Sequence, residues 1–316
     1  MTLVPFDDRD GSIWWDGHLI PWRDAKLHVL SHGLHYASAV FEGERAYAGH
    51  IFKLREHTER LIESGRILGF EIPYSADQID DACNQVLAAS GLTDAYIRPL
   101  AWRGAEQLSV AAQNTSIHLM VAVWAWPNLF GADRMKGVSL GMAPWKRPHP
   151  ETAPTRSKAA GLYMIGTMSR HAVEAQGFND ALMLDWRGQV SEATGANIFF
   201  VMDGKLHTPT PDCFLDGITR RTVIALAQKR QIPVIERAIM PEEMAGATEV
   251  FLVGTAAEVT PVRQIDQLHF TPGKITETLL RDYEALVRMS PDEVARIAWL
   301  LVAVPVLVGQ AAMRAP

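Results

Sequence analysis

Cysteine is nearly absent from this chain, with Cys83 and Cys213 as the only two among 316 residues. Two thiols so far apart in the sequence indicate neither a disulfide framework nor a cysteine-based metal site. The N-terminal stretch MTLVPFDDRDG lacks the basic and apolar segments of a signal peptide. We therefore expect a cytoplasmic protein, because thiols stay reduced in that compartment.

The chain also lacks a block of like charges and a long apolar run. Its net charge is −6 and its pI is about 6.0, with lysine and arginine scattered along the sequence. Such a composition does not attract nucleic acid or an anionic membrane, so we expect neither as a partner. The longest apolar run, 297–309, contains Pro305 and is shorter than the roughly 20 residues that span a bilayer as a helix.

The length and the 48% content of hydrophobic residues indicate a globular α/β (α+β) protein of two domains. Hydrophobic periodicity and turn residues predict a small N-terminal α+β domain over residues 1–126. Its expected strands are 13–15, 18–22, 39–47, 50–54, 95–102 and 117–125, and its expected helices are 55–68 and 76–90. Residues 127–136, PNLFGADRMK, have turn residues and little periodicity, so they are predicted to form an interdomain linker.

A larger C-terminal α/β domain is predicted over residues 137–289. Its expected strands are 137–143, 180–185, 197–202, 205–208, 233–237 and 249–253, and its expected helices are 160–176, 217–230, 241–245 and 272–288. Residues 290–316 form a separate tail, in which the capping box Ser290–Glu293 predicts a helix from residue 291. This tail helix is expected to dock on the chain or to meet another subunit.

The segment APTRSKAAGLY, 153–163, places Lys158 among small residues, so a flat ring can approach its amine closely. An amine removed from water loses its proton more easily, and the neutral amine is the nucleophile that forms a Schiff base. The alternative is an ordinary exposed lysine in a loop. This segment alone does not decide between the two.

Four further features fit a phosphate-bearing pyridine ring beside Lys158. Glu192 lies in a connection between two predicted strands, and a carboxylate opposite a pyridine nitrogen keeps that nitrogen protonated. The sequence LDGITRRTV places residues 217–219 at a helix N-terminus, which binds anions, and Thr255 follows a strand in a second small-residue turn. Arg55 and Arg98 suit bidentate contact to phosphate or carboxylate. Each feature alone has an ordinary structural explanation, but together they predict pyridoxal 5′-phosphate as cofactor.

Three histidines at helical spacing raise the alternative of a metal site. His28, His32 and His35 are four and three residues apart, but Gly33 interrupts them and no carboxylate is near. We favour histidines that pack and hydrogen-bond, and we expect no metal.

Taken together, these motifs resemble those of the fold-type IV PLP-dependent aminotransferases, in particular the bacterial branched-chain amino acid aminotransferases. The resemblance covers about residues 10–285, and the matching pieces occur in the family's order. They are SHGLHYASAVFEGERAY, FKLREHTERL, AYIRPL, TRSKAAGLY, SEATGANIFF, LDGITRRTV and VGTAAEVTPV.

The resemblance implies a cofactor site built around Lys158, which would bind PLP covalently and move the proton of the substrate α-carbon. Glu192 would pair with the pyridine nitrogen, and Tyr163 would hydrogen-bond the phenolic oxygen. The phosphate would be bound by Arg55, Gly217, Ile218, Thr219 and Thr255, and the ring would be lined by Gly195, Ala196 and Asn197.

The resemblance also implies a substrate site. Ala256 would help bind the α-carboxylate, and Tyr96 and Arg98 would hold substrate carboxylates, with Arg98 reaching the distal carboxylate of glutamate. The walls of the apolar pocket would be Tyr36, Phe41, Val110 and Trp126, some of them contributed by a neighbouring subunit of a homodimer or higher homo-oligomer. Leu129 stands in the pocket loop where many relatives have tyrosine, and Leu162 replaces an asparagine before Tyr163.

The activity implied is transamination of L-leucine, L-isoleucine and L-valine with 2-oxoglutarate. Rival activities on the same fold are D-amino acid or (R)-amine transamination and aminodeoxychorismate lysis, which eliminates pyruvate. The pair Tyr96 and Arg98 favours the branched-chain activity over these. A non-catalytic binding protein on the same scaffold is disfavoured by the intact Lys158 and Glu192.

Overall fold

The computed structural model describes residues 4–126, 131–290, 292–293, 296 and 307–308. The chain divides into two compact units, and each is described by itself. The first contains Met1–Asn128 and Pro154–Met164, and the second contains Leu129–Ala153 and Ile165–Pro316. The segment that carries Lys158 thus groups with the first unit, although it lies inside the range predicted for the C-terminal domain. The predicted domain boundaries themselves stay a prediction.

A seven-stranded sheet forms the first unit over the residues described there. The strands are β1 (Ser12–Trp15), β2 (His18–Pro21), β3 (Ala39–Phe41), β4 (Glu44–Tyr47), β5 (His50–Ile51), β6 (Ala95–Arg103) and β7 (Ile117–Ala125). They follow the order β2-β1-β7-β6-β4-β5, with β3 beside β6. The predicted hairpin at Asp16-Gly17 is confirmed, since Trp15 pairs with His18 and both turn residues have positive φ.

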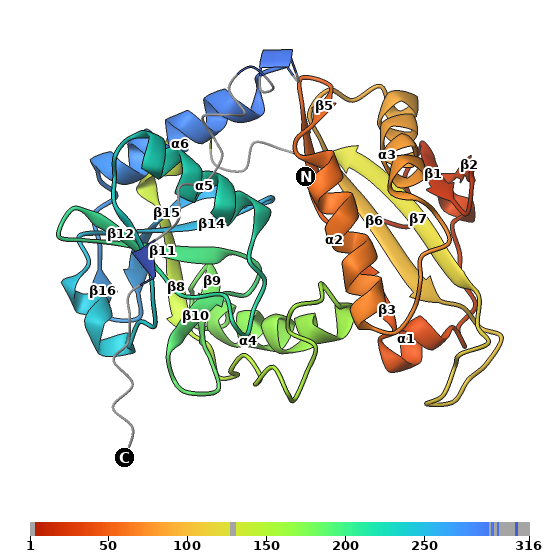
Figure 1. Ribbon diagram of the computed structural model, residues 1–316, viewed down its shortest axis with the longest axis horizontal. Coiled ribbons are helices and arrows are strands. Elements are labelled where there is room, and N and C mark those ends of the chain that lie inside the picture. The colour runs from red at the N-terminus through yellow and green to blue at the C-terminus, as the bar shows by residue number, and fades with distance from the viewer. Residues whose placement is uncertain (1–3, 127–130, 291, 294–295, 297–306, 309–316) are drawn as a thin grey trace. The chain divides into compact units, whose positions relative to one another are not determined.

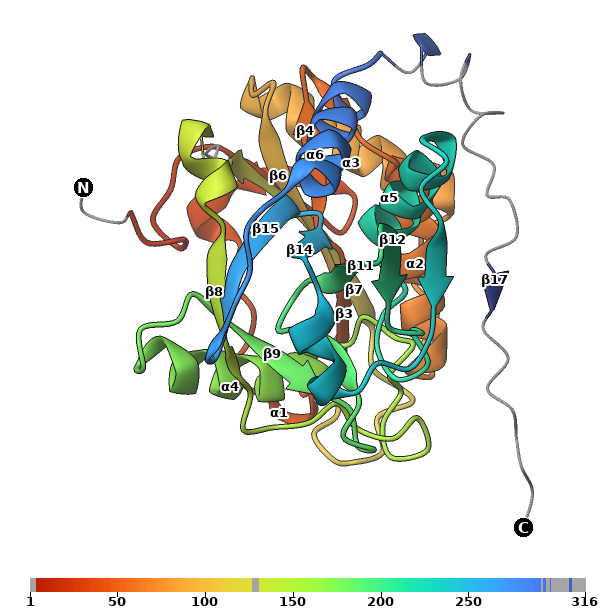
Figure 2. The same ribbon diagram turned by 90° about the vertical axis from the view of Figure 1, so that its left-hand side faces the viewer.

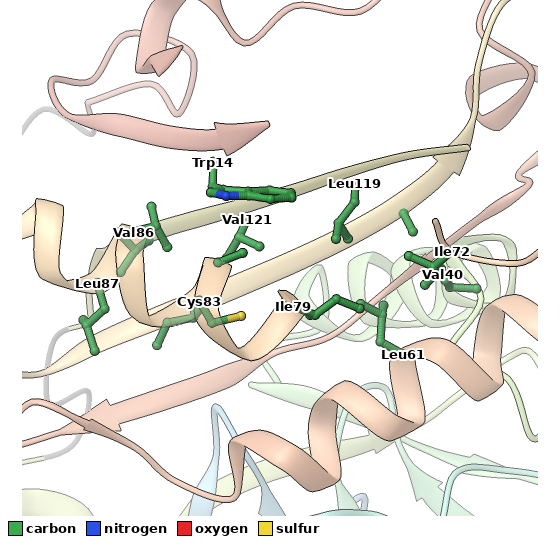
Figure 3. Close-up of a cluster of buried hydrophobic side chains, with 14 of the residues drawn as sticks. Trp14, Val40, Leu61, Ile72, Ile79, Cys83, Val86, Leu87, Leu119 and Val121 are labelled. Atoms are coloured by element: carbon green, nitrogen blue, oxygen red, sulfur yellow. The ribbon is translucent and has the colours of Figure 1, made fainter. Parts of the chain in front are cut away.

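Helices α2 (Leu54–Ile67) and α3 (Ala76–Ser90) lie alongside this sheet (Figure 1), and both predicted helices are confirmed to within a residue. A capping box of Ser75 and Gln78 starts α3. The short α1 (His32–Tyr36) and the 3₁₀ turns η1 (Trp22–Asp24) and η3 (Ala160–Tyr163) complete the unit. In Figure 3 the core residues of α3 face Leu119 and Val121 of β7, with Leu61 of α2 nearby.

The prediction of a single strand over 39–47 is wrong, because Glu42 and Gly43 interrupt the strand and divide it into β3 and β4. The backbone N–H of Glu42 donates to the carbonyl of Pro99, and the Glu42 side chain turns to buried partners on α2. The strand predicted over 50–54 also ends early, since Lys53 adopts a left-handed conformation (φ 54°) at the start of α2.

One carboxyl group lies inside the core of the first unit. Glu44 on β4 is fully buried, and no N–H or O–H group among the described residues hydrogen-bonds to its carboxyl oxygens. Burial, and then the Glu42 and Asp80 carboxylates, raises the pKa of Glu44 well above its ordinary value, and Cys83 and Arg60 oppose this only weakly. Its surroundings therefore favour the neutral, protonated form of Glu44.

The second unit contains a ten-stranded sheet over its described residues. The strands are β8 (Val138–Met142), β9 (Asp180–Leu184), β10 (Val190–Ala193), β11 (Asn197–Met202), β12 (Lys205–Thr208), β13 (Val234–Glu236), β14 (Glu249–Gly254), β15 (Glu258–Ile265), β16 (Leu268–His269) and β17 (Leu307–Val308). Figure 2 shows β8 beside β15, which are paired in parallel. Because β10 pairs with both β9 and β11, the strands β10-β9-β8-β15-β14-β11 close into a ring.

Helices α5 (Ile218–Lys229) and α6 (Lys274–Val287) pack on β14 of this sheet (Figure 1). The other helical elements are α4 (Met164–Glu174), η2 (Gly131–Lys136) and η4 (Pro241–Gly246). The helix predicted over 160–176 begins as the 3₁₀ turn η3 and becomes α-helical at Met164. Strands β10 and β15 were not predicted, because short segments with polar and small residues give no clear alternation.

Two predictions fall partly outside the described residues. The linker 127–136 is described only from Gly131, where η2 begins. The tail helix predicted from 291 is helical at the positions described there, 292, 293 and 296, but the chain is not helical at Leu307–Val308, which forms β17 parallel to the edge strand β13. An edge strand offers free backbone groups to such a segment. No helix in the described part of the chain is long and apolar enough to traverse a bilayer.

Candidate active site

Lys158 is fixed to the first unit through its backbone. Its N–H donates to Ser64 Oγ of α2 at 3.0 Å, and its carbonyl accepts from the Phe41 N–H at 3.2 Å. The neighbouring Ser157 donates its hydroxyl to the Ser64 carbonyl, and Ala159 bridges to Val40. The Lys158 segment is therefore held between β3 and α2.

The Lys158 side chain is half-buried and faces aromatic groups of the first unit. Its Nζ donates to the Tyr163 hydroxyl at 2.8 Å. The same Nζ lies 5.1 Å from the centroid of the Phe41 ring, and the Phe41 and Tyr163 rings are 4.8 Å apart. The structure thus brings together three residues predicted for the cofactor and substrate sites.

The face of α2 that holds Lys158 carries a buried charged cluster. Glu42 Oε1 accepts from Arg60 Nε at 2.6 Å, and Glu42 Oε2 hydrogen-bonds His57 Nδ1 at 2.7 Å. Burial alone raises the pKa of Glu42, but Arg60 and His57 outweigh it, so this pKa lies well below the ordinary value. Burial lowers the pKa of the His57 ring despite Glu42, and the charges of Arg60 and Lys158 lower it further. His57 and Arg60 are therefore on the same helix as Ser64, the residue that binds the Lys158 N–H.

The surroundings of Arg55 do not fit its predicted place in a phosphate site. Arg55 is exposed, and its guanidinium pairs with Asp77 at 2.5 Å and with Asp80 at 2.8 Å, both on α3. It is five positions before Arg60 on the helix, a spacing that turns the two side chains to different faces of α2. On this helix, Arg60 shares the Lys158-bearing face with Ser64, whereas Arg55 does not.

The residues predicted to hold substrate carboxylates form a second cluster in the first unit. Arg98 Nη2 donates to the Tyr96 hydroxyl at 3.0 Å, and the guanidinium lies 4.6 Å from the Phe41 ring centroid. Trp126 packs on Tyr96 with ring centroids 4.7 Å apart. Gly43 makes this possible, since a Cβ at that position would overlap the Tyr96 hydroxyl. The cluster combines a half-buried cation with aromatic walls.

Two predicted wall residues lie elsewhere on the surface of the first unit. Tyr36 is 46% exposed and stacks on His32, and Val110 is 86% exposed. No described contact joins either one to the Phe41 and Arg98 cluster. Leu129 lies outside the described residues.

The three histidines considered for a metal site bind backbone groups instead. His28 Nδ1 accepts from the Leu30 N–H, while His32 and His35 each use Nε2 with a backbone carbonyl. These contacts fit the packing role that was favoured from the sequence.

Glu192 lies in the second unit, on β10 rather than in a connection between strands. Its side chain is buried, with Oε1 3.1 Å from Arg147 Nη2 and Oε2 accepting from Asn197 Nδ2 at 3.0 Å. Glu192 and Asn197 are directly paired where β10 meets β11 and closes the ring of strands. The predicted site carboxylate is thus held from two sides.

The N-terminus of α5 meets the same residues. Asn197 Nδ2 also donates to the Leu215 carbonyl at 3.1 Å, and Asn197 Oδ1 occupies the space that a Cβ on Gly217 would need. In the described part of the chain no side chain caps α5, whose first residues Ile218 and Thr219 are buried. Its first N–H groups are therefore suited to a phosphate anion.

The small-residue turns predicted for the ring and the carboxylates also meet in the second unit. Asn197 pairs with Val253, which places Gly195 and Ala196 beside Gly254. Thr255 and Ala256 follow Gly254 directly in the turn before β15, and Ala256 is exposed. Glu192, the N-terminus of α5 and the turn after β14 are thus neighbours on one unit.

Comparison with known proteins agrees with this arrangement. Residues 39–265 match the family "Amino-transferase class IV". The chain belongs to this family. The branched-chain-amino-acid aminotransferases of Pseudomonas aeruginosa and Escherichia coli are 39% and 37% identical to it over 288 residues each, covering 89% of this chain and 94% and 93% of theirs. A crystal structure of the branched-chain amino acid aminotransferase from Thermobaculum terrenum in PLP-form superposes with a TM-score of 0.82 at 31% identity. The superposition covers 88% of this chain and 94% of that one.

Four residues around the site of this class IV aminotransferase were not predicted from the sequence. Glu42, His57 and Arg60 lie in the quoted motifs but were given no role, and Arg147 lies outside every motif. The spacing of residues 57, 60 and 64 on one helical face was the available signal for the first three. For Arg147, no pattern in the sequence indicates that it reaches Glu192.

Proposed function

We propose that the chain transfers the amino group of L-leucine, L-isoleucine or L-valine to 2-oxoglutarate, with pyridoxal 5′-phosphate as cofactor. The observation that carries this proposal is the Lys158 amine on the Tyr163 hydroxyl, beside the Phe41 ring on which Arg98 lies. The relatives named above support the same activity, and the one solved in PLP-form supports the same cofactor.

The residues present fit this cofactor. Lys158 supplies an amine next to a phenol, Glu192 is a buried carboxylate, and α5 starts with no side-chain cap. When bound, the pyridinium ring takes up the electron pair left when the substrate α-carbon loses its proton. We propose that Lys158 holds the cofactor, that Tyr163 binds its phenolic oxygen, and that Glu192 pairs with its ring nitrogen.

The phosphate is proposed to bind at the N-terminus of α5, through Ile218 and Thr219, with Thr255 as a further donor. We propose Arg60 in place of Arg55 as the arginine of this site, because Arg60 shares a helix face with the Ser64 that holds Lys158. Its pairing with Glu42 orients the guanidinium.

The chain's own side chains then account for the two kinds of substrate. Lys158 Nζ would take the proton from the substrate α-carbon and deliver it to C4′ of the cofactor, and the hydroxyl of Tyr163 would orient this amine. Phe41 and Trp126 bury a branched aliphatic side chain, which contributes roughly 1.5–3 kcal/mol. The guanidinium of Arg98 pairs with the distal carboxylate of glutamate.

We also propose that the active species is a homodimer or higher homo-oligomer in the cytoplasm. The first unit exposes apolar side chains close together in sequence at Leu27, Val29, Leu30 and Leu34, with exposed fractions of 44% to 69%. Such a concentration is typical of an interface with a second copy. The exposed Tyr36 and Val110 are then available to a partner's site. Mixing a Lys158→Ala protein with a Tyr36→Ala protein should restore part of the activity if sites are shared between copies.

A direct assay tests the activity. The purified protein is incubated with 2-oxoglutarate and each of L-leucine, L-isoleucine, L-valine, D-alanine and (R)-1-phenylethylamine, and glutamate is measured. We expect the three branched L-amino acids to give the fastest glutamate formation, and the proposal fails if D-alanine or the amine reacts faster than all of them. Lys158→Ala should abolish turnover while the protein still folds, whereas Lys205→Ala, at an exposed lysine, should not change it.

A further inference from the structure

Arg147 makes a buried contact that nothing in the sequence motifs or the proposed chemistry assigns. Its Nη2 lies 3.1 Å from Glu192 Oε1, and the two residues are 7% and 8% exposed. Because Asn197 engages the other oxygen, the carboxylate is held by one cation and one amide. Contacts on both oxygens leave the carboxylate only a narrow range of orientations.

The guanidinium also binds the backbone that follows Glu192. Arg147 Nη2 donates to the carbonyl of Thr194 at 3.1 Å and to that of Ala193 at 3.4 Å. One side chain therefore fixes both the carboxylate and the end of β10 that carries it. A shorter, neutral side chain at this position would lose the ion pair with Glu192 and weaken the hold on the end of β10.

Arg147 is itself anchored to the neighbouring strand. Its backbone N–H donates to the Leu184 carbonyl of β9 at 2.8 Å, and its backbone forms an isolated parallel β-bridge with that of Asp185. Since β9 pairs with β10, the arginine spans from one strand to the acid on the next. Pro148 follows and fixes its own φ, so the backbone at this point has little freedom.

We infer that Arg147 is a positioning residue, which orients the Glu192 carboxylate toward the cofactor's ring nitrogen without touching the cofactor or substrate. This inference rests on the proposed function, because it assumes that Glu192 is the partner of that nitrogen. It makes the arginine part of the aminotransferase site through Glu192 alone. A purely structural role would give effects that are independent of Glu192.

The test compares Arg147→Gln, Arg147→Lys, Glu192→Gln and the double variant of Arg147→Gln with Glu192→Gln. Lys146→Gln is the matched control, because it removes the adjacent positive charge from an exposed side chain. Three quantities are measured: PLP affinity by titration of the apoprotein, the thermal midpoint of the apoprotein, and the pH dependence of the bound cofactor's absorbance.

Arg147→Gln is expected to weaken PLP binding about 10- to 100-fold, the range for a lost hydrogen bond to a charged group. It should also lower the apoprotein's thermal midpoint and shift the absorbance profile, while Arg147→Lys gives an intermediate result. In the Glu192→Gln background the same change should have little further effect on PLP affinity and on the absorbance profile, since no charge is left to orient, although the lost contacts to the Ala193 and Thr194 carbonyls still lower the thermal midpoint. If Arg147→Gln alone does not fold, the double variant can still be compared with Glu192→Gln, because it removes both charges of the pair.

Effects that add fully in the double variant, or an Arg147→Gln protein that behaves like Lys146→Gln, would overturn the inference and leave the proposed function intact. Unchanged PLP affinity and absorbance in Glu192→Gln alone would instead refute the proposed role of Glu192. The inference would then fall with that role.

Discussion

Replacing Glu44 by methionine should stabilise the first unit, and the gain should grow with pH. Glu44 is fully buried, and in the folded protein its pKa is raised well above the ordinary value, first by burial and then by Glu42 and Asp80. Methionine has a similar volume and no polar atoms, so it leaves no buried group without a partner.

The direction of this pH dependence of stability follows from proton binding. Above pH 4.5, the ordinary glutamate value, the unfolded chain releases the Glu44 proton while the folded protein keeps it. The folded state then binds more protons, so the free energy of unfolding falls as pH rises, by about 1.4 kcal/mol per pH unit. From pH 5 to pH 7 the wild type should lose stability relative to Glu44→Met, by at most about 3 kcal/mol, because the loss continues only up to the raised pKa of Glu44. Glu42 stays ionised across this window because its pKa is depressed, so it does not contribute to the difference.

Hydrogen–deuterium exchange of β6 peptides at increasing urea measures this free energy locally. A local probe is needed because a chain of two units need not unfold in one transition. Glu59→Met on the exposed side of α2 is the matched control and should give no such pH dependence. The reasoning would be refuted if the difference in unfolding free energy between the wild type and Glu44→Met were the same at pH 5 and pH 7. It would also be refuted if Glu44→Met were less stable than the wild type at pH 7.

Two further predictions concern the site itself. Arg60→Ala should weaken PLP binding and destabilise the protein by about 3 kcal/mol, since it leaves the Glu42 carboxylate buried without its arginine partner. The exposed Arg55→Ala should cost less than about 1 kcal/mol. PLP titration and thermal unfolding compare the two variants, and equal effects would contradict the reassignment. Gly43→Ala should raise the KM for glutamate and 2-oxoglutarate about tenfold, because the new Cβ displaces the Tyr96 hydroxyl that Arg98 contacts. Steady-state kinetics with both substrates measure this KM, and an unchanged value would contradict the prediction.

The sequence predicted the elements whose local signals are strong. The helices α2 and α3 were located to within a residue, because apolar periodicity and the Ser75 cap mark them. The hairpin at Asp16-Gly17 was equally clear from its turn residues. Strand β10 was missed, since its four residues gain their strand character only from pairing on both sides with β9 and β11.

The site was predictable where one residue carries the chemistry by itself. Lys158 and Tyr163, which the resemblance assigns to one cofactor, are five positions apart and hydrogen-bond to each other, while their roles toward the cofactor stay a prediction. Arg55 and Arg60 could not be distinguished by motif alone, because the choice depends on which face of α2 turns to the lysine segment. Arg147 was out of reach, since its contact with Glu192 depends on the register between β9 and β10.

The path of the chain through its two units affects the order in which it can fold during synthesis. The first unit is complete only when Pro154–Met164 has joined Met1–Asn128, yet residues 129–153 belong to the other unit. A ribosome therefore delivers the lysine only after it has begun the second body of the protein. A fragment that ends at residue 128 would lack Lys158 and the rest of Pro154–Met164. A cut at this point in the sequence therefore does not separate the two units.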